Sequence, residues 1–454
     1  MHCLSLIIGS AALCAGGTYD EAFRPQFHFT PKRNWMNDPN GLVYFKGEYH
    51  LFFQHNPLGI DGGNTSWGHA VSPDLVHWTE LEPVLRPDSD GDIWSGSAVI
   101  DWENTAGLRQ GKEPVICAFY TASGNPFTQR MAYSTDRGRT FTRYDKNPIL
   151  GHIVGGNRDP KVFRYAPGKH WVMVLYLDGD EYAIFNSVDL THWTQTSSLH
   201  FPNDGECPDL FELPVDGNRA SAKWVFVAGS GRYIIGSFDG KSFVPEAGPF
   251  TGDHGAHYYA TQTYNDAPDG RRIQIAWMRN LGGYPGMPFN QQMNFPCECT
   301  LRTFPDGVRM CRTPVREIEK LRVKHYKWRD VTVSPGENLL AGVKGELFDI
   351  SATIEVKDAK GIGFRLHGRE VTYDPATHVL TALGRTAELL PGDRVSLRIL
   401  LDRNTLEVYA EFGRTVLSSC FIADGNSGLS LVTTAGRVKV AAMDVYELKS
   451  AWPK

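Results

Sequence analysis

The chain has 454 residues, with 46 Lys and Arg against 51 Asp and Glu, a formal net charge of -5 at pH 7 and 12% aromatic residues. This nearly balanced charge argues against a nucleic-acid-binding protein, because such a protein neutralises many phosphates. It contains no apolar run of the roughly 18 residues that a membrane-spanning helix needs. The length favours two domains, each with its own hydrophobic core.

The N-terminus is typical of a secretory leader. Residues 4–15 are apolar and end in small residues, as in the central region of a signal peptide. No Lys or Arg precedes Arg24, which is unusual for a signal peptide, so a short leader without a targeting role is the alternative. We expect residues 1–20 to be a leader segment and the protein to be secreted or periplasmic.

A repeated pattern of strand-like runs follows. The starts of five apolar and aromatic runs lie 66, 56, 53 and 49 residues apart: 49–53, 115–120, 171–176, 224–228 and 273–278. Four of them precede a Ser-x-Asp turn, with the acids Asp74, Asp136, Asp189 and Asp239 spaced by 62, 53 and 50 residues. Four-stranded units at such intervals are typical of a β-propeller. The repeats predict an all-β, five-bladed propeller over residues 21–325; the alternative is a β-sandwich with coincidental spacing.

A second domain is expected after the repeats. Residues 315–321 are rich in charge and predict a short helix or a linker. Beyond them, residues 347–354, 396–401 and 406–409 have the patterns of strands and are separated by Gly, Asp and Asn turns. These features predict a β-sandwich over residues 326–454.

The cysteines do not form a metal or redox motif. Six lie outside the leader and none forms a C-x-x-C pair, which argues against a zinc ribbon or a thioredoxin-like site. Cys297, Cys299 and Cys311 are close enough in sequence to hold one disulfide, and buried free thiols are the other interpretation.

Acidic residues begin three of the predicted innermost strands, each with a Pro one or two residues later. They are Asp38, Asp159 and Glu206, which lie 121 and 47 residues apart in sequence. Equivalent positions of successive blades face the same mouth of a propeller, so these acids should converge. Converging carboxylates repel one another and persist for catalysis or for a metal. Calcium would need more oxygen ligands than any loop here offers, and three strand-opening turns are the structural alternative.

Two carboxyl groups facing each other across a sugar can cleave a glycosidic bond, since one protonates the departing oxygen while the other attacks or stabilises the anomeric carbon. Sugar recognition also needs flat apolar surfaces and hydrogen-bonding groups. Residues of these kinds lie near the predicted strand ends: Trp35, Gln54, Trp67, Trp94, Ser95 and Trp277. We expect Trp78, Trp193 and Trp224 to fill the core between blades instead.

These motifs resemble a known enzyme family. Trp-Met-Asn-Asp-Pro-Asn-Gly at residues 35–41, Arg-Asp-Pro at 158–160 and Glu-Cys-Pro-Asp at 206–209 are similar to glycoside hydrolase family 32, the invertases, inulinases and levanases. The resemblance covers about residues 24–450 and implies a five-bladed propeller followed by a β-sandwich. It also implies a retaining hydrolase without metal or cofactor, which releases terminal fructosyl units from inulin, levan or sucrose.

The resemblance implies a role for each matching residue. Asp38 would be the nucleophile, Glu206 the general acid and then base, and Asp159 with Arg158 would hold the fructose hydroxyls. The fructose subsite would be formed by Asn37, Gln54, Trp67, Trp94, Ser95 and Trp277. The sequence departs from the family at Cys297-Glu298-Cys299, where Arg-Glu-Leu is usual, and at Trp94, where Phe is common.

Two alternatives stay open at this stage. A fructosyltransferase would use the same residues and pass the fructosyl group to a sugar. A non-catalytic fructan-binding propeller would keep the aromatic residues and lose an acid, whereas all three acids are present. The motifs are nearest to the levanase and exo-inulinase members, which favours a fructan exo-hydrolase; they leave the oligomeric state open.

Overall fold

A computed structural model describes residues 19–453 except 358, 360, 434 and 435, so the predicted leader lies almost entirely outside the described residues. Within that part of the chain the elements are strands and three short 3-10 helices: η1 (Pro268–Gly270), η2 (Arg316–Leu321) and η3 (Glu411–Gly413). η2 occupies the charged segment predicted as a short helix or linker. No helix among the described residues is long and apolar enough to cross a membrane.

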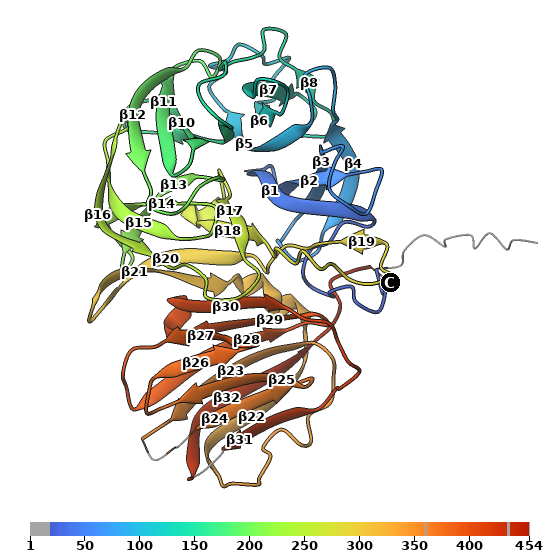
Figure 1. Cartoon of the computed structure of the whole chain (residues 1–454), viewed down its shortest axis with the longest axis vertical. Helices are drawn as coiled ribbons and strands as arrows, with labels where there is room; N and C mark the ends of the chain where they lie inside the picture. The colour runs from blue at the N-terminus through green and yellow to red at the C-terminus, as the bar shows by residue number, and fades with distance from the viewer. Residues whose placement is uncertain (1–18, 358, 360, 434–435, 454) are drawn as a thin grey trace, which may run out of the picture.

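The N-terminal domain is a ring of antiparallel sheets around a central axis (Figure 1). Its first four units are β1 (Asn34–Phe45), β2 (Glu48–Asn56), β3 (Ser66–Ser72), β4 (Thr79–Leu85); β5 (Ile93–Asp101), β6 (Val115–Ala122), β7 (Thr128–Ser134), β8 (Thr142–Arg143); β9 (Arg158–Tyr165), β10 (His170–Asp178), β11 (Glu181–Ser187), β12 (Thr194–His200); and β13 (Asp209–Val215), β14 (Asn218–Val227), β15 (Tyr233–Phe238), β16 (Phe243–Phe250). Each unit is a meander in which consecutive strands pair.

The last strands of this domain close the ring. They are β17 (Tyr259–Thr263), β18 (Ile273–Trp277), β19 (Phe289–Asn290), β20 (Cys297–Phe304) and β21 (Gly307–Pro314). β17, β18, β20 and β21 form one further group, which joins the fourth unit through a parallel bridge between Val215 and Leu301. β19 pairs in parallel with β1, so the end of the ring is tied to its beginning.

The repeats in the sequence correspond to one position in this architecture. The five predicted runs fall within or at the end of β2, β6, β10, β14 and β18, the second strand of each unit, where residues such as Phe53, Phe119 and Val174 are completely buried. The repeated Asp bonds its own turn: Asp189 Oδ1 accepts from the backbone N–H of Thr191 and His192, each over 2.9 Å. These hydrogen bonds stabilise the turn between the third and fourth strands of the unit.

The C-terminal domain is a sandwich of two antiparallel sheets. One has the order β22-β32-β23-β28-β29-β30 and the other β27-β26-β25-β24-β31. The strands are β22 (Arg322–Val333), β23 (Phe348–Glu355), β24 (Ile362–Leu366), β25 (Arg369–Asp374), β26 (Val379–Ala382), β27 (Arg385–Glu388), β28 (Arg394–Leu401), β29 (Thr405–Ala410), β30 (Thr415–Cys420), β31 (Leu429–Thr433) and β32 (Val438–Leu448). Apolar residues of both sheets form one core between them. The predicted class, a propeller followed by a β-sandwich, is confirmed.

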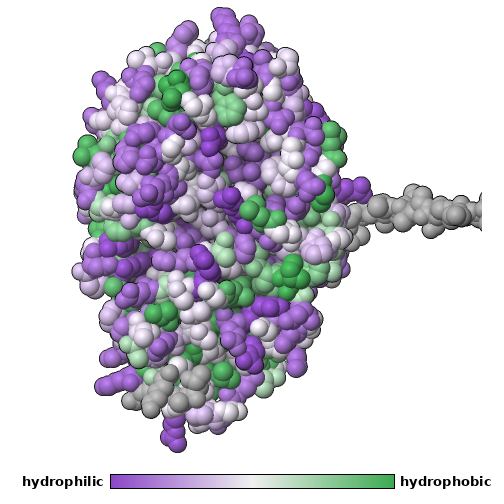
Figure 2. All heavy atoms as spheres, viewed as in Figure 1, coloured by the Kyte–Doolittle hydropathy of each residue, from purple (hydrophilic) through white to green (hydrophobic). Residues whose placement is uncertain are grey.

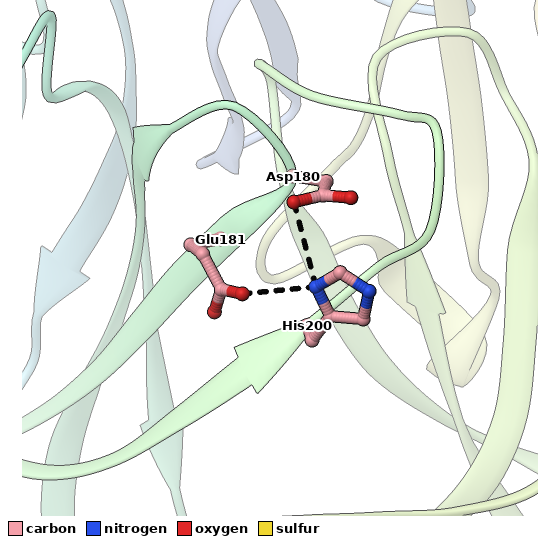
Figure 3. A group of neighbouring side chains, drawn as sticks. All are labelled: Asp180, Glu181 and His200. Carbon is pink, nitrogen blue, oxygen red and sulfur yellow. Dashed lines mark hydrogen bonds and ion pairs between the residues drawn. The ribbon is translucent and has the colours of Figure 1, made fainter.

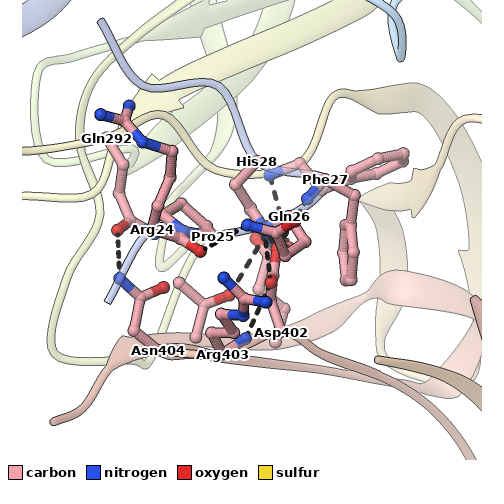
Figure 4. A network of polar contacts seen from close by, with 12 residues as sticks. Arg24, Pro25, Gln26, Phe27, His28, Gln292, Asp402, Arg403 and Asn404 are labelled. Carbon is pink, nitrogen blue, oxygen red and sulfur yellow. Dashed lines mark hydrogen bonds and ion pairs between the residues drawn. The ribbon is translucent and has the colours of Figure 1, made fainter. Parts of the chain in front are cut away.

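The polypeptide that precedes β1 is wedged between the two domains (Figure 4). Buried Asp402 of the sandwich accepts hydrogen bonds from the backbone N–H of Gln26 and Phe27 over 2.7 and 3.0 Å. The ring of His28 lies between two buried carboxylates, with Nδ1 2.8 Å from Asp402 and Nε2 3.0 Å from Glu407. The chain segment that leads into β1 is therefore held in place by hydrogen bonds to the sandwich.

The face seen in Figure 2 is largely polar, with hydrophobic residues scattered over it. The six cysteines of the described residues are all buried and unpaired, so Cys297, Cys299 and Cys311 have the free-thiol form and no disulfide. The predicted core role holds for Trp78, which is buried. Trp193 and Trp224 are only partly buried and pack against the edges of two core clusters, Trp224 on Phe238.

Candidate active site

The three acids that begin predicted strands meet in one cavity of about 400 Å³ at one mouth of the propeller. Asp38 comes from β1, Asp159 from β9 and Glu206 from the loop before β13. The cavity is lined by Trp35, Asn37, Asp38, Gln54, Gly63, Thr65, Asp92, Trp94, Arg158, Asp159, Glu206, Cys207, Tyr259, Trp277 and Arg279. The convergence inferred from the repeats is therefore present.

Like Asp159, Asp38 is buried in the wall of the cavity. Its residue is 9% exposed, and Ser95 Oγ donates a hydrogen bond to its Oδ2 over 2.6 Å. The thiol of Cys207 lies 3.7 Å from the same oxygen. Burial, together with the charge of Asp159, raises the pKa of Asp38 to about 7. Both contacts reach Oδ2, and no hydrogen bond to Oδ1 is formed among the described residues.

Asp159 is held from both its backbone and its side chain. Its N–H donates to Thr121 Oγ1 over 3.0 Å, and its Oδ2 accepts from the N–H of Cys207, also over 3.0 Å. Burial raises the pKa of Asp159 to about 6, and the neighbouring Arg158 guanidinium, whose Nε lies 3.8 Å from Oδ2, limits that rise. The three acids outnumber the two arginines of the cavity, Arg158 and Arg279.

Glu206 has a different environment. Arg158 Nη2 donates to its Oε1 over 2.6 Å, and the hydroxyl of Tyr259 donates to its Oε2. Burial alone would raise its pKa, but these hydrogen bonds and the charge of Arg158 outweigh burial and leave the pKa of Glu206 below its usual value. The site therefore contains two carboxylates, Asp38 and Glu206, whose pKa values are shifted in opposite directions.

The backbone is strained where these acids are held. Asp159, Glu206 and Cys207 have φ values of 63°, 62° and 39°, in the left-handed region that costs a non-glycine residue about 1 kcal/mol or more. The cost is offset by contacts such as that of the Tyr182 hydroxyl, which donates to the carbonyl of Glu206 over 3.2 Å. Such strain is concentrated at functional sites because it directs side chains that a relaxed strand would turn away.

Most of the predicted binding residues line the cavity: Asn37, Gln54, Trp94, Arg158 and Trp277. Asn37 Oδ1 is buried and has no hydrogen-bond partner among the described residues, so it is available to a ligand hydroxyl. Two predicted residues lie behind the wall. Ser95 is fully buried and bonds Asp38 and Gln54, and Trp67 is fully buried with Nε1 donating to the carbonyl of Trp94 over 3.0 Å.

Several lining residues were missed by sequence reasoning. Tyr259 begins β17, an innermost strand, so the register argument that found Asp38 could have found it as well. Arg279 follows Trp277 by two residues, and its guanidinium lies 4.8 Å from the centre of the Tyr259 ring. Thr65 and Asp92 lie in loops, which have no periodic sequence pattern from which their position could be predicted.

One group of side chains outside this cavity has the composition of a metal site (Figure 3). His200 Nδ1 lies 2.9 Å from Glu181 Oε1 and 3.4 Å from Asp180 Oδ1. All three side chains are well exposed, and none of them lines the cavity with the three acids. Ion pairing between the ring and the two acids is sufficient to explain their arrangement.

A propeller cavity with two carboxylates of unlike pKa, a compensating arginine and tryptophan walls defines a glycoside hydrolase, in which such carboxylates act on a sugar held between them. Comparison with known proteins gives the family. The model for the glycosyl hydrolases family 32 N-terminal domain matches residues 28–314, and that for the family 32 C-terminal region matches residues 317–447. The chain belongs to glycosyl hydrolase family 32, which confirms the resemblance in its motifs.

Relatives extend over nearly the whole chain. A levanase of Bacillus subtilis (strain 168) is 40% identical over 494 residues, which cover 98% of this chain and 73% of that protein. An extracellular exo-inulinase of Aspergillus niger is 32% identical over 526 residues, covering 97% of each. The crystal structure of exo-inulinase from Aspergillus awamori superposes with a TM-score of 0.88 at 29% identity, covering 96% of this chain and all of that one.

Proposed function

We propose that this protein is a retaining β-fructofuranosidase, secreted or periplasmic, which releases terminal fructosyl units from fructans and from sucrose. The main support for this proposal is that Asp38 and Glu206 line one cavity, where their surroundings raise the pKa of Asp38 and lower that of Glu206. The names of the relatives, levanase and extracellular exo-inulinase, support the substrate class and the location. In this proposal residues 21–325 are the catalytic domain and residues 326–454 the supporting sandwich.

Asp38 acts as the nucleophile in the first step. Its free Oδ1 attacks the anomeric carbon of the fructosyl unit, while the hydrogen bond from Ser95 fixes Oδ2. The new bond joins Oδ1 to that carbon, and the bond from the carbon to the leaving oxygen breaks. Glu206 gives its proton to the departing oxygen, so the products are a fructosyl-enzyme and a neutral alcohol.

The second step reverses these roles. Glu206, now ionised, takes a proton from water, and the hydroxide oxygen bonds to the anomeric carbon as the ester to Asp38 breaks. Two displacements at one carbon retain the anomeric configuration. A sugar hydroxyl in place of water would give transfer with the same residues, so the balance between hydrolysis and transfer depends on which acceptor occupies the cavity.

Substrate has to redistribute one proton before this chemistry begins. The pKa of Asp38 lies near 7 and that of Glu206 below its usual value, so Asp38 holds the proton that the first step needs on Glu206. A leaving oxygen that accepts a hydrogen bond from Glu206 favours the protonated form of that acid. The ionised form of Asp38 then follows, and the pair titrates as a unit.

Asp159 and Arg158 hold the fructosyl unit in this scheme. The carboxylate of Asp159 and the free amide oxygen of Asn37 accept hydrogen bonds from sugar hydroxyls, while Arg158 keeps Glu206 in place. Trp94 and Trp277 give the flat walls against which an apolar sugar face packs. Ser95 and Trp67 support the subsite from behind through Asp38 and Trp94.

The test is turnover of sucrose, inulin and levan by the purified protein, with the products identified. We expect fructose with retained configuration, and a loss of at least about 10⁴-fold in kcat for Asp38→Ala, because the attacking group is removed while the subsite is kept. Azide added to that variant should restore turnover and give fructosyl azide of inverted configuration. Wild-type rates in Asp38→Ala, or products of inverted configuration from the wild-type protein, would contradict the proposed mechanism.

A further inference from the structure

A second cavity lies at the opposite end of the innermost strands. Its volume is about 440 Å³, and it shares no lining residue with the catalytic cavity. Strand β9 connects the two, with Arg158 at the catalytic end and Tyr165 at the other. Seven residue steps of about 3.3 Å separate these residues, so the two cavities are about 23 Å apart along the strand. We call this second cavity the rear cavity.

The two cavities are separated by buried side chains. Halfway along β9, the ammonium group of Lys161 lies 3.2 Å from Asp209 Oδ2 and donates to the carbonyl of Thr263 over 2.7 Å. Nearer the rear, the amide of Asn265 donates to the carbonyls of Ala98 and Val162. The rear cavity is therefore a site in its own right and not the end of an open channel.

Its walls are rich in aromatic rings. Trp102, Tyr165, Phe163, Trp171, Trp224 and Phe238 all line it. Trp102 is 50% exposed, and its indole N–H donates to Asp266 Oδ1 over 3.2 Å, which holds the ring in one orientation. A fixed and half-exposed indole in a concave site is the kind of surface on which a pyranose or furanose ring packs.

The polar groups of the rear cavity favour a neutral ligand. Glu103, Glu212 and Asp266 are nearly balanced by Arg164 and Arg272, so neither an anion nor a cation is selected. Arg164 Nη1 is buried and has no hydrogen-bond partner among the described residues, although Nη2 bonds Glu103 over 2.5 Å. Buried donors are normally hydrogen-bonded, so this donor in the cavity wall can be satisfied by an oxygen atom of a bound ligand.

We propose that the rear cavity is a second, non-catalytic sugar site that binds fructosyl residues of a polymeric fructan. This inference rests on the proposed function, since it identifies the sugar from the substrate. Sucrose is too short to occupy both sites, whereas one polymer particle can engage the rear cavity and present a chain end to Asp38. Binding at two sites raises the effective concentration of chain ends at the catalytic cavity.

The kinetic test compares Trp102→Ala and Arg164→Gln with the wild-type protein on levan, inulin and sucrose. For whichever of levan and inulin the wild-type protein hydrolyses, we expect kcat/KM to fall about 3- to 10-fold in each variant, because the contact of the polymer with the rear cavity is lost. On sucrose it should stay within about twofold, since Trp102 does not line the catalytic cavity. Phe412→Ala is the matched control, because that ring is 64% exposed and lies outside both cavities.

A binding experiment separates this inference from the proposed function. Retardation in gels that contain levan or inulin is measured for Asp38→Asn, which turns over no substrate in our scheme, with and without Trp102→Ala. Weaker retardation of the double variant supports the rear site even if the wild-type protein hydrolyses neither polymer. Equal retardation, or equal losses on sucrose and polymer in both rear-cavity variants at unchanged melting temperature, would overturn the inference.

Discussion

Asp38 should destabilise the folded protein at neutral and alkaline pH. Its pKa is about 7 in the folded state, because the side chain is buried and faces Asp159, whereas an unfolded aspartate titrates near 4. Between these values the folded chain binds more protons than the unfolded chain, so the free energy of unfolding falls as pH rises from about 4 to about 7. Asp38→Asn removes this dependence and keeps an oxygen that accepts from Ser95.

The size of the effect follows from the shift. A change from 3.8 to about 7 corresponds to about 4 kcal/mol at 1.36 kcal/mol for each pKa unit. Because the charge of Asp159 contributes to this shift and the two acids titrate together, we take about 2–4 kcal/mol for the effect of the Asp38→Asn variant. The unfolding entropy of a chain of this length is about 1 kcal/mol/K. The melting temperature of Asp38→Asn relative to that of the wild-type protein should therefore rise by about 2–4 °C between pH 4.5 and pH 8.

Thermal unfolding is measured for both proteins at intervals across that pH range, and the difference between their melting temperatures is plotted. Asp239→Asn is the control: the backbone N–H groups of Ser242 and Lys241 lower the pKa of Asp239, so its contribution is complete above about pH 5. Its difference from wild type should be constant up to pH 8. A difference for Asp38→Asn that is flat, or that shrinks as pH rises, would refute the assignment of buried excess charge to Asp38.

Three further perturbations have expected outcomes. Glu206→Gln should lower kcat by about 10²- to 10⁴-fold on sucrose and far less on an aryl fructoside whose leaving group needs no proton; equal losses would contradict the general-acid role. Arg279→Gln removes a positive charge that lowers the pKa of Glu206, so the acid limb of the kcat/KM profile, which reports the lower of the two pKa values in the free enzyme, should move to higher pH; an unmoved acid limb would contradict the influence of Arg279 on Glu206. Although burial lowers the pKa of His28, hydrogen bonds to Asp402 and Glu407 raise it to about 9, so its stabilisation is complete below about pH 6.5 and is lost as pH rises through 9. His28→Gln, which leaves two buried carboxylates unpaired, should cost about 3–5 kcal/mol at pH 6 and less at pH 9.5 by thermal unfolding; a deficit that grows with pH would contradict the charged form of His28.

The repeats predicted the propeller because each unit has to solve the same packing problem. The second strand of a unit is buried on both faces, as Phe53 and Phe119 are, so its sequence is continuously apolar and easy to recognise. The turns after the third strands were recognisable because only a few side chains, such as that of Asp189, can bond the backbone there. Once the units were recognised, the three acids could be placed at one mouth of the propeller, because they occupy equivalent positions at the start of innermost strands.

The rest of the site could not be predicted because it depends on which face of a strand is turned inward. Trp67 and Trp94 both lie near strand ends, yet Trp67 is buried behind the wall and Trp94 forms it. The left-handed backbone at Glu206 and Cys207 breaks the strand alternation on which such predictions depend. The rear cavity likewise arises from residues of many strands that share no motif.

The wedge of residues 24–28 limits how this architecture can be recombined. Asp402 and Glu407 belong to the sandwich by sequence, yet their hydrogen bonds are completed by His28 and by the backbone of Gln26 and Phe27. A chimera that joins this propeller to another sandwich would inherit a histidine without acids, and the reciprocal chimera would inherit acids without a histidine. A functional exchange of domains therefore has to transfer the short N-terminal peptide together with the sandwich.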